Sequence, residues 1–217
     1  MSSDWLSEDK LISYKNQVGD SDDYPLKTKI RLSKRKHVPV LILGSRTYPI
    51  WQLKRVRTVE KTGLELDSWA QDIIFELPEF KKYYLPPFSL KGKTVLDIGA
   101  CCGETAWFYL KQGAQKVICI EPDPTRVKMI EINKKNLNMN VEIIADCFRP
   151  EHLSLEHNFV KCDIEGYETL LLPYAKSLKP CILEAHTWLI REQFEKEGFH
   201  VVCTPQKNAI VCLMANY

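Results

Sequence analysis

The chain has 217 residues, 45% apolar and 27% charged, with a formal net charge of +2. This is the composition of an ordinary globular protein with one domain and an appendage, and the absence of sequence repeats excludes a repeat architecture. No run approaches the length of a membrane span, about 18 apolar residues, and MSSDWLSEDK lacks the basic start and apolar stretch of a signal peptide, so we expect a cytoplasmic protein without a membrane segment.

The first ninety residues are expected to form an N-terminal extension, a basic cap that contains β-strands. Residues 4–23 are polar and acid-rich and read as a frayed helix, whereas Val38–Leu43 and Val56–Val59 have the apolar character of strands. We therefore place the extension at residues 1–90 and a Rossmann-like domain at residues 91–217.

Charge in the extension is one-sided, because residues 24–62 contain eleven Lys or Arg and a single acid, Glu60. Such a segment suits a polyanion, which makes residues 27–61 a candidate RNA-binding segment. The alternative is a solvated basic face that docks on the acidic remainder of the chain. Both interpretations stay open.

From Lys93 onward, apolar runs alternate with helical patterns, which is typical of a mostly parallel sheet with helices on both faces. Strands are predicted at 94–98, 116–120, 141–144, 159–163, 181–184, 199–203 and 209–214, and helices at 104–112, 125–137, 167–177 and 187–197. Residues 204–208 are too few for a crossover helix, so the last strand should run antiparallel. The predicted fold class is α/β, with a seven-stranded mostly parallel sheet whose last strand is antiparallel.

The segment TVLDIGACCGE ends a buried strand in an acid, Asp97, and opens into a turn bracketed by glycines. A carboxylate here would repel the pyrophosphate of a dinucleotide, so we expect a cationic or hydroxyl-rich ligand. S-adenosylmethionine is both, since its amino and sulfonium groups are positive and its ribose carries hydroxyls. The expected cofactor residues are Asp97, Gly99, Gly103 and Glu104, with a helix or turn cap as the alternative role of Asp97.

Two later strand ends complete the expected cofactor site. Glu121 follows Asp97 by 24 residues, in the turn EPDP with Pro122, at the spacing where dinucleotide folds place an acid on ribose hydroxyls. Asp146 and Cys147 follow the third strand, where a carboxylate accepts a hydrogen bond from the adenine amino group and its neighbour packs on the ring. A helix N-cap is the alternative role of Asp146.

The fourth and fifth strands end in KCDIEGYE and ILEAH, which bring acids to the edge that faces the methyl group. The expected catalytic residues are Asp163, Glu165, Glu184 and His186. His186 has an ordinary pKa near 6.5, so it is a candidate general base at neutral pH or a hydrogen-bonding partner of the acceptor. Oxygen and imidazole ligands also suit a divalent metal, but acids are common at such edges without one, and we expect no metal.

The eight cysteines are interpreted as packing residues rather than as a disulfide framework. Only Cys101 and Cys102 lie in a loop, and the absence of any C-x-x-C spacing argues against a tetrahedral zinc site. The other six lie in or beside predicted strands: Cys119, Cys147, Cys162, Cys181, Cys203 and Cys212.

Together these motifs resemble the FkbM family of S-adenosylmethionine-dependent methyltransferases, over residues 92–214. VLDIGACCGETAWFYLKQGAQKVICIEPDP is similar to the first two strands and cofactor loop of the family, with Cys101 and Cys102 where the family has Asn and a second small residue. KCDIEGYE and LEAH resemble its D-x-E-G-x-E and E-x-H motifs. The resemblance implies an O-methyltransferase acting on a sugar or other small hydroxylated molecule, with cofactor residues Asp97, Gly99, Glu121 and Asp146.

Two other functions compete with this one. A tRNA methyltransferase would use the basic segment at 27–61 to bind RNA, although acids in the fourth-strand loop would repel phosphates. A non-catalytic module that binds nucleic acid or protein is also compatible with such a fold, but it would have no need of Asp97, Glu121 and the acid cluster.

Overall fold

The computed structural model describes residues 29–32, 39–43, 46–49, 52, 56, 59–67, 70, 77–178, 180–203 and 211–214. The frayed helix expected at 4–23 and the turn expected at 204–208 lie outside these residues, as does a large part of the basic segment at 27–61. The chain divides into two compact units, Met1–Leu64 with Ser68–Pro78, and Glu65–Asp67 with Glu79–Tyr217.

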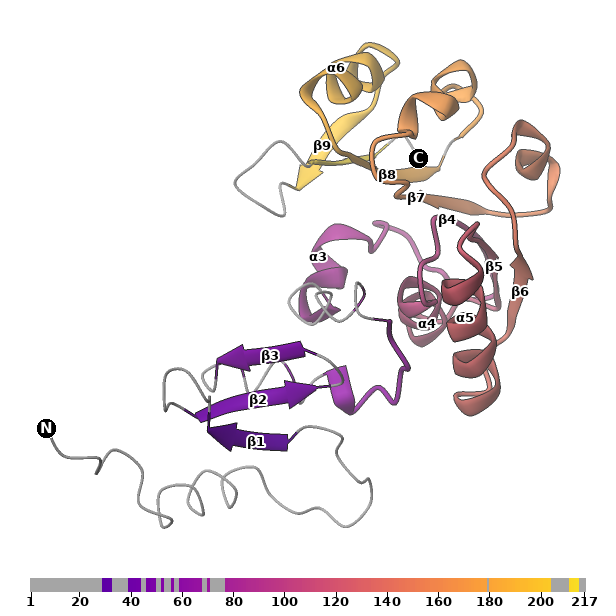
Figure 1. Ribbon diagram of the computed structural model, residues 1–217. Helices are drawn as coiled ribbons and strands as arrows, with labels where there is room; N and C mark the ends of the chain where they lie inside the picture. The colour runs from indigo at the N-terminus through magenta and orange to yellow at the C-terminus, as the bar shows by residue number, and fades with distance from the viewer. Residues whose placement is uncertain are drawn as a thin grey trace, which may run out of the picture. The chain divides into compact units, whose positions relative to one another are not determined.

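The first unit contains a small antiparallel sheet (Figure 1). Its strands, in the order β1-β2-β3, are β1 (Lys29–Leu32), β2 (Pro39–Leu43) and β3 (Arg46–Pro49). β2 confirms the strand expected at Val38–Leu43, where branched apolar residues favour extended backbone. The strand expected at Val56–Val59 is wrong, because Val56 and Val59 are helical and buried. Their spacing of three residues places both side chains on one face of a helix.

The second unit is built on a mostly parallel sheet. Its strands are β4 (Thr94–Ile98), β5 (Lys116–Ile120), β6 (Val141–Ile144), β7 (Phe159–Cys162), β8 (Cys181–Ala185), β9 (His200–Cys203) and β10 (Val211–Met214). The order across the sheet is β6-β5-β4-β7-β8-β10-β9. The strands from β6 to β8 pair in parallel, whereas β10 is antiparallel to both β8 and β9. The predicted α/β class with a parallel sheet is confirmed.

The described residues of the second unit also form four α-helices and two 3-10 helices. They are α3 (Phe80–Tyr83), α4 (Glu104–Lys111), α5 (Pro124–Asn136), α6 (Trp188–Lys196), η4 (Pro150–Ser154) and η5 (Glu168–Tyr174), and a further 3-10 turn, η3 (Leu77–Glu79), precedes α3. The helix expected at 167–177 is a short 3-10 helix, because the ring of Pro173 inside it would clash with the carbonyl group four residues earlier in an α-helix.

Successive side chains of a strand point to opposite faces of the sheet, and the two faces pack against different helices. Leu96 and Ile98 join one buried cluster with Leu171 of η5 and Phe194 of α6. Asp97, which points the other way, accepts a hydrogen bond from α4. Helices therefore cover both faces, as predicted. In Figure 1, α4 and α5 lie together beside β4–β6, while α6 lies near β8 and β9.

This topology brings several strand ends to one edge of the sheet, since β4, β5, β6, β7 and β8 all run in the same direction. In open α/β sheets ligands bind outside the carboxyl ends of the strands. Within the described part of the chain, no helix has the length and apolar character needed to cross a membrane.

Candidate functional site

The turn after β4 requires glycine for two physical reasons. Gly99 has a φ of +77°, and a Cβ atom there would lie 1.8 Å from the carbonyl oxygen of Asp163. The backbone of the turn therefore runs directly against the end of β7, at a distance that no other residue allows. Gly103, at +83°, lies against Ile130 of α5, where a Cβ atom would approach to 3.4 Å.

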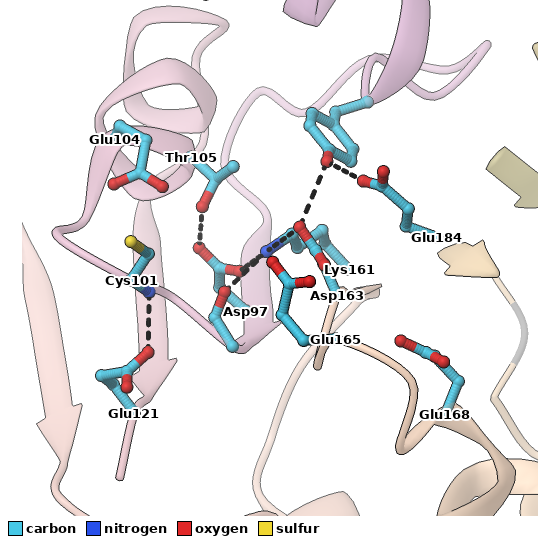
Figure 2. Close-up of polar contacts among 12 residues, drawn as sticks. Asp97, Cys101, Glu104, Thr105, Glu121, Lys161, Asp163, Glu165, Glu168 and Glu184 are labelled. Atoms are coloured by element: carbon cyan, nitrogen blue, oxygen red, sulfur yellow. Dashed lines mark hydrogen bonds and ion pairs between the residues drawn. The ribbon is translucent and has the colours of Figure 1, made fainter. Parts of the chain in front are cut away.

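Asp97 is fully buried and ion-paired, which differs from the exposed position expected for a residue that contacts a ligand. It accepts a 2.5 Å hydrogen bond from the Thr105 hydroxyl, and its Oδ1 lies 3.1 Å from Nζ of Lys161. Figure 2 shows Asp97 between these two side chains. In this conformation the carboxylate of Asp97 has no exposed surface, and it lies beneath the turn after β4.

Lys161, a residue that the sequence reasoning missed, organises this region. Its side chain is buried on β7, and its Nζ donates a 2.8 Å hydrogen bond to the carbonyl oxygen of Gly99. Burial alone lowers the pKa of Lys161, but the negative charges of Asp97, Asp163 and Glu104 outweigh it and raise that pKa. Lys161 is therefore charged, and it connects the turn after β4 to β7. A lysine inside the apolar run FVKC was the signal available in the sequence.

Glu121, at the end of β5, joins two neighbouring loops. Its Oε2 accepts a 2.9 Å hydrogen bond from the Cys101 backbone, and its Oε1 accepts one of 3.0 Å from the Asp123 backbone. Burial is the main reason that the pKa of Glu121 is raised. Pro122 is exposed beside it. Each carboxylate oxygen keeps a second lone pair for a ligand hydroxyl.

Glu104 begins α4 and is nearly inaccessible, with 3% of its surface exposed. Its Oε2 accepts a 3.0 Å hydrogen bond from the Cys102 backbone. Burial raises its pKa to about 8, although that hydrogen bond and the charge of Lys161 act in the opposite direction. Cys101 has a φ of +48°, which is uncommon for a residue other than glycine.

The loop after β6 contains Asp146 and Cys147, two of the expected cofactor residues. Asp146 pairs with Arg149, and one of its carboxylate oxygens lies 3.9 Å from Nε2 of His152. Cys147 is an exposed thiol, so its interpretation as a packing residue is wrong, because it follows the strand rather than facing the core. The described thiols that are buried, as expected, are Cys102, Cys119, Cys162 and Cys181. The side chains of Cys203 and Cys212 lie outside the described residues.

The ends of β7 and β8 bring Asp163, Glu165 and His186 together. Nε2 of His186 lies 3.4 Å from a carboxylate oxygen of Glu165 and 3.6 Å from one of Asp163. Its Nδ1 lies 2.7 Å from Oε1 of Glu168, a fully buried acid. Glu184 is bound by the hydroxyl of Tyr84, which also lies 3.4 Å from Asp163 (Figure 2). All four predicted catalytic residues therefore lie in one acidic cluster.

This setting changes the expected role of His186. Burial lowers its pKa, but the hydrogen bond to Glu168 and the charges of Asp163, Glu168 and Glu184 outweigh burial and raise it to about 9. The imidazole of the protein alone is therefore protonated at neutral pH, and it has no free lone pair for general-base catalysis there.

Two members of the cluster were not among the predicted site residues. Glu168 is the last acid of KCDIEGYE, so the motif held a signal for it. Tyr84 lies about 80 residues earlier in the chain, and only the tertiary fold brings its hydroxyl to Asp163 and Glu184.

The chain matches no protein-family model, and no curated protein matches it. Its fold is similar to solved methyltransferase structures. A magnesium protoporphyrin IX methyltransferase from Synechocystis PCC 6803, with bound SAH, is 13% identical over 75% of this chain and 93% of that chain, with a TM-score of 0.52. Aeropyrum pernix fibrillarin, with natively bound S-adenosyl-L-methionine, is 12% identical over 65% of this chain and 74% of that chain, with a TM-score of 0.51.

A third structure, the C-terminal domain of precorrin-6Y C5,15-methyltransferase from Rhodobacter capsulatus, is 14% identical over 71% of this chain and 94% of that chain, with a TM-score of 0.50. Identities this low establish a shared fold, the class I fold of S-adenosylmethionine-dependent methyltransferases. The predicted Rossmann-like methyltransferase fold is thereby confirmed. No family match supports the finer FkbM assignment.

Proposed function

We propose that this protein is an S-adenosylmethionine-dependent methyltransferase that methylates a hydroxyl group of a small or sugar-like acceptor, in the manner of the FkbM family it resembles. The observation that carries the proposal is the contact between the glycine turn and the acidic loop. A Cβ atom on Gly99 would lie 1.8 Å from the Asp163 carbonyl oxygen, so a donor held by the turn lies next to the acids that face an acceptor.

The cofactor residues have distinct roles in this proposal. Glu121, at the end of β5, binds the ribose hydroxyls with the lone pairs that its two backbone hydrogen bonds leave free. Asp146 and Cys147, at the end of β6, border the adenine. Asp97 acts indirectly, because with Lys161 it fixes the turn from inside the protein.

When bound, S-adenosylmethionine supplies a methyl group on a positive sulfur, which an in-line attack displaces as a neutral sulfide. The protein then has two tasks, which are to align the acceptor and to take up its proton. Glu165, with a side chain 57% exposed at the mouth of the cluster, is the most accessible carboxylate for the proton. His186, charged in the protein alone, orients an acceptor oxygen as a hydrogen-bond donor.

The apolar surface near the cluster suits an acceptor with an apolar part. Tyr167 and Trp188 are 69% and 60% exposed and each follows a cluster residue by two positions, while Leu170 and Leu189 are exposed on the same two segments. These exposed apolar side chains on the two segments that follow the cluster are therefore candidates for contact with the acceptor.

A tRNA methyltransferase is the second candidate, and the basic segment at 27–61 is the observation that favours it. Against it stands the acidic cluster, which would repel the phosphates of an RNA close to the methyl donor.

One experiment separates these candidates. The purified protein is incubated with methyl-labelled S-adenosylmethionine and, in parallel, with a metabolite extract and an RNA extract. The proposal predicts label in the small-molecule fraction, and this label should be lost in Asp163→Asn. Label confined to RNA would establish the second candidate. If neither extract is labelled and the cofactor does not bind, the fold serves as a non-catalytic binding module.

A further inference from the structure

We propose that Asp163, Glu165 and His186 bind one divalent cation at the carboxyl ends of β7 and β8. One ligand atom from each of the three residues lies within 4.8 Å of the other two. Nε2 of His186 lies 3.6 Å from Oδ1 of Asp163 and 3.4 Å from Oε2 of Glu165, and both distances are long for hydrogen bonds. Two ligand atoms held at about 2.1 Å from one cation are about 3.0–3.4 Å apart, so the imidazole already lies near ligand spacing from each carboxylate.

The imidazole of His186 is oriented as in metal sites. Its Nδ1 is bound to Glu168 at 2.7 Å, and the other ring nitrogen faces the two carboxylates. In the neutral ring, a hydrogen on Nδ1 leaves the lone pair of Nε2 directed at the cation. A histidine that ligates a metal almost always donates its other N–H to a carboxylate or carbonyl in this way.

Glu168 supplies a second, independent observation. It is 0% exposed, and its Oε2 has no hydrogen-bond partner among the described residues, while its Oε1 accepts from both His186 and the Gly166 backbone. An unpartnered carboxylate oxygen in a buried position is costly. A cation bound to the adjacent imidazole offsets this cost.

Asp163 is also positioned for coordination. Its Oδ2 lies 3.4 Å from the Tyr84 hydroxyl and 4.0 Å from Nζ of Lys161. These contacts leave Oδ1 directed at the imidazole, and that atom is buried with no hydrogen-bond partner among the described residues. The aspartate therefore presents its unused oxygen to the proposed cation.

The charge balance of the cluster favours a cation. Four acids meet at this edge, and the positive groups beside them are shared among several acids. Nζ of Lys161 lies 3.1 Å from Asp97 and 4.0 Å from Asp163, and the imidazole of His186 lies within 4 Å of three carboxylates. The four acids are Asp163, Glu165, Glu168 and Glu184. Glu165 also has a φ of +55°, a strained conformation for a residue other than glycine, of the kind that clusters at functional sites.

Two carboxylates and one imidazole suit a cation such as Mn²⁺ or Mg²⁺. Three protein ligands leave coordination positions open, as in catalytic metal sites. If the proposed function holds, the cation would take the place of the His186 hydrogen bond to the acceptor, because Nε2 of a ligating imidazole carries no hydrogen. The open positions would then receive an oxygen of the acceptor, whose proton dissociates more easily.

The test is a titration of the chelator-treated full-length protein with Mn²⁺ alone, followed by the electron paramagnetic resonance signal of the free ion. The wild type should bind one Mn²⁺ with a dissociation constant below about 1 mM, within the range of oxygen-rich protein sites. Glu165→Gln, which changes an exposed side chain, should weaken binding at least tenfold. Glu156→Gln, an exposed acid outside the cluster, should bind as the wild type does.

Absence of Mn²⁺ binding by the wild type would overturn the proposal, and so would equal binding by Glu165→Gln. Thermal unfolding of both variants in chelator should match that of the wild type, which shows that the site rather than the fold has changed. The titration contains neither S-adenosylmethionine nor acceptor. If the protein binds Mn²⁺ but not S-adenosylmethionine, the cation site stands and the proposed function is wrong. If it binds S-adenosylmethionine but not Mn²⁺, the proposed function stands and the cation site is wrong.

Discussion

Nζ of Lys161 lies 3.1 Å from Oδ1 of Asp97, and the two residues are 1% and 0% exposed. This buried ion pair connects the centre of β7 to the centre of β4, and the same ammonium group holds the carbonyl oxygen of Gly99 at 2.8 Å. The residue at the start of the cofactor turn is therefore fixed from below by a charge on the neighbouring strand.

Replacing Lys161 with Met should lower the free energy of unfolding by about 3–5 kcal/mol, because it leaves the Asp97 carboxylate buried without its partner. Adding Asp97→Asn should recover part of the loss, since the unpaired charge is then removed. Urea unfolding measures both effects. The exposed Lys128 provides the control variant Lys128→Met, and a Lys161→Met loss as small as that of the control would contradict the structural role of the pair.

Gly99→Ala should destabilise the protein by more than about 3 kcal/mol, because it combines a positive φ with a backbone clash. Gly92→Ala is a matched control: Gly92 has a φ of +72°, similar to the +77° of Gly99, but nothing lies within 4 Å of its added Cβ. The control should cost only about 1 kcal/mol. Similar losses in the two variants would show that the close approach of the turn to Asp163 is not present in solution.

Stability should depend on the ionisation of Glu104. The folded-state pKa of Glu104, about 8, lies above its ordinary value of 4.5. Its contribution to the free energy of unfolding is therefore complete below about pH 4.5, where the carboxyl is protonated in both states, and is lost as the pH rises through 8. The side chain in Glu104→Gln is neutral at every pH. The free energy of unfolding of this variant should therefore rise by on the order of 2–4 kcal/mol relative to that of the wild type between about pH 5 and pH 9.

Urea unfolding at several pH values measures the effect of Glu104→Gln. The exposed residue Glu131 gives the control variant Glu131→Gln, whose pH profile should parallel that of the wild type. A parallel profile for Glu104→Gln as well would mean that the Glu104 carboxyl is hydrated in the folded protein.

Trp188→Ala should raise the KM for the acceptor about tenfold with little change in kcat, if the exposed indole binds the acceptor before reaction. Trp188 is 60% exposed and begins α6, two residues after His186. Thermal unfolding should barely change. Val202→Ala removes another exposed apolar side chain, 42% accessible on β9, and should leave KM unchanged. A fall in kcat alone would place Trp188 outside the acceptor site.

The sequence predicted the sheet well because each strand is a short apolar run followed by turn residues. The bounds of β4, β5 and β6 agree with the predicted ranges to the residue. The strand predicted at Val56–Val59 is wrong because a run of four residues cannot distinguish period two from period three. The predicted range 167–177 includes Pro173, which favours a short 3-10 helix over a long α-helix there.

The candidate site was only partly predictable, because its chemistry depends on contacts between distant segments. The motifs identified Asp163, Glu165 and His186, and parallel topology implied that they meet. Nothing in their spacing revealed that Glu168 is fully buried against the imidazole, which is what raises the pKa of His186. Likewise, the pairing of Asp97 with Lys161 arises from the register between β4 and β7, and it buries the Asp97 carboxylate.

Binding of S-adenosylmethionine to the wild-type protein can be measured by calorimetric titration. We expect saturable binding at one site per chain, with a dissociation constant in the micromolar to millimolar range of enzyme substrates. Binding should be at least tenfold weaker in Glu121→Ala, which removes the proposed ribose contact. Absence of any binding heat up to about 10 mM cofactor, at two temperatures, would show that this protein is not an S-adenosylmethionine-dependent methyltransferase.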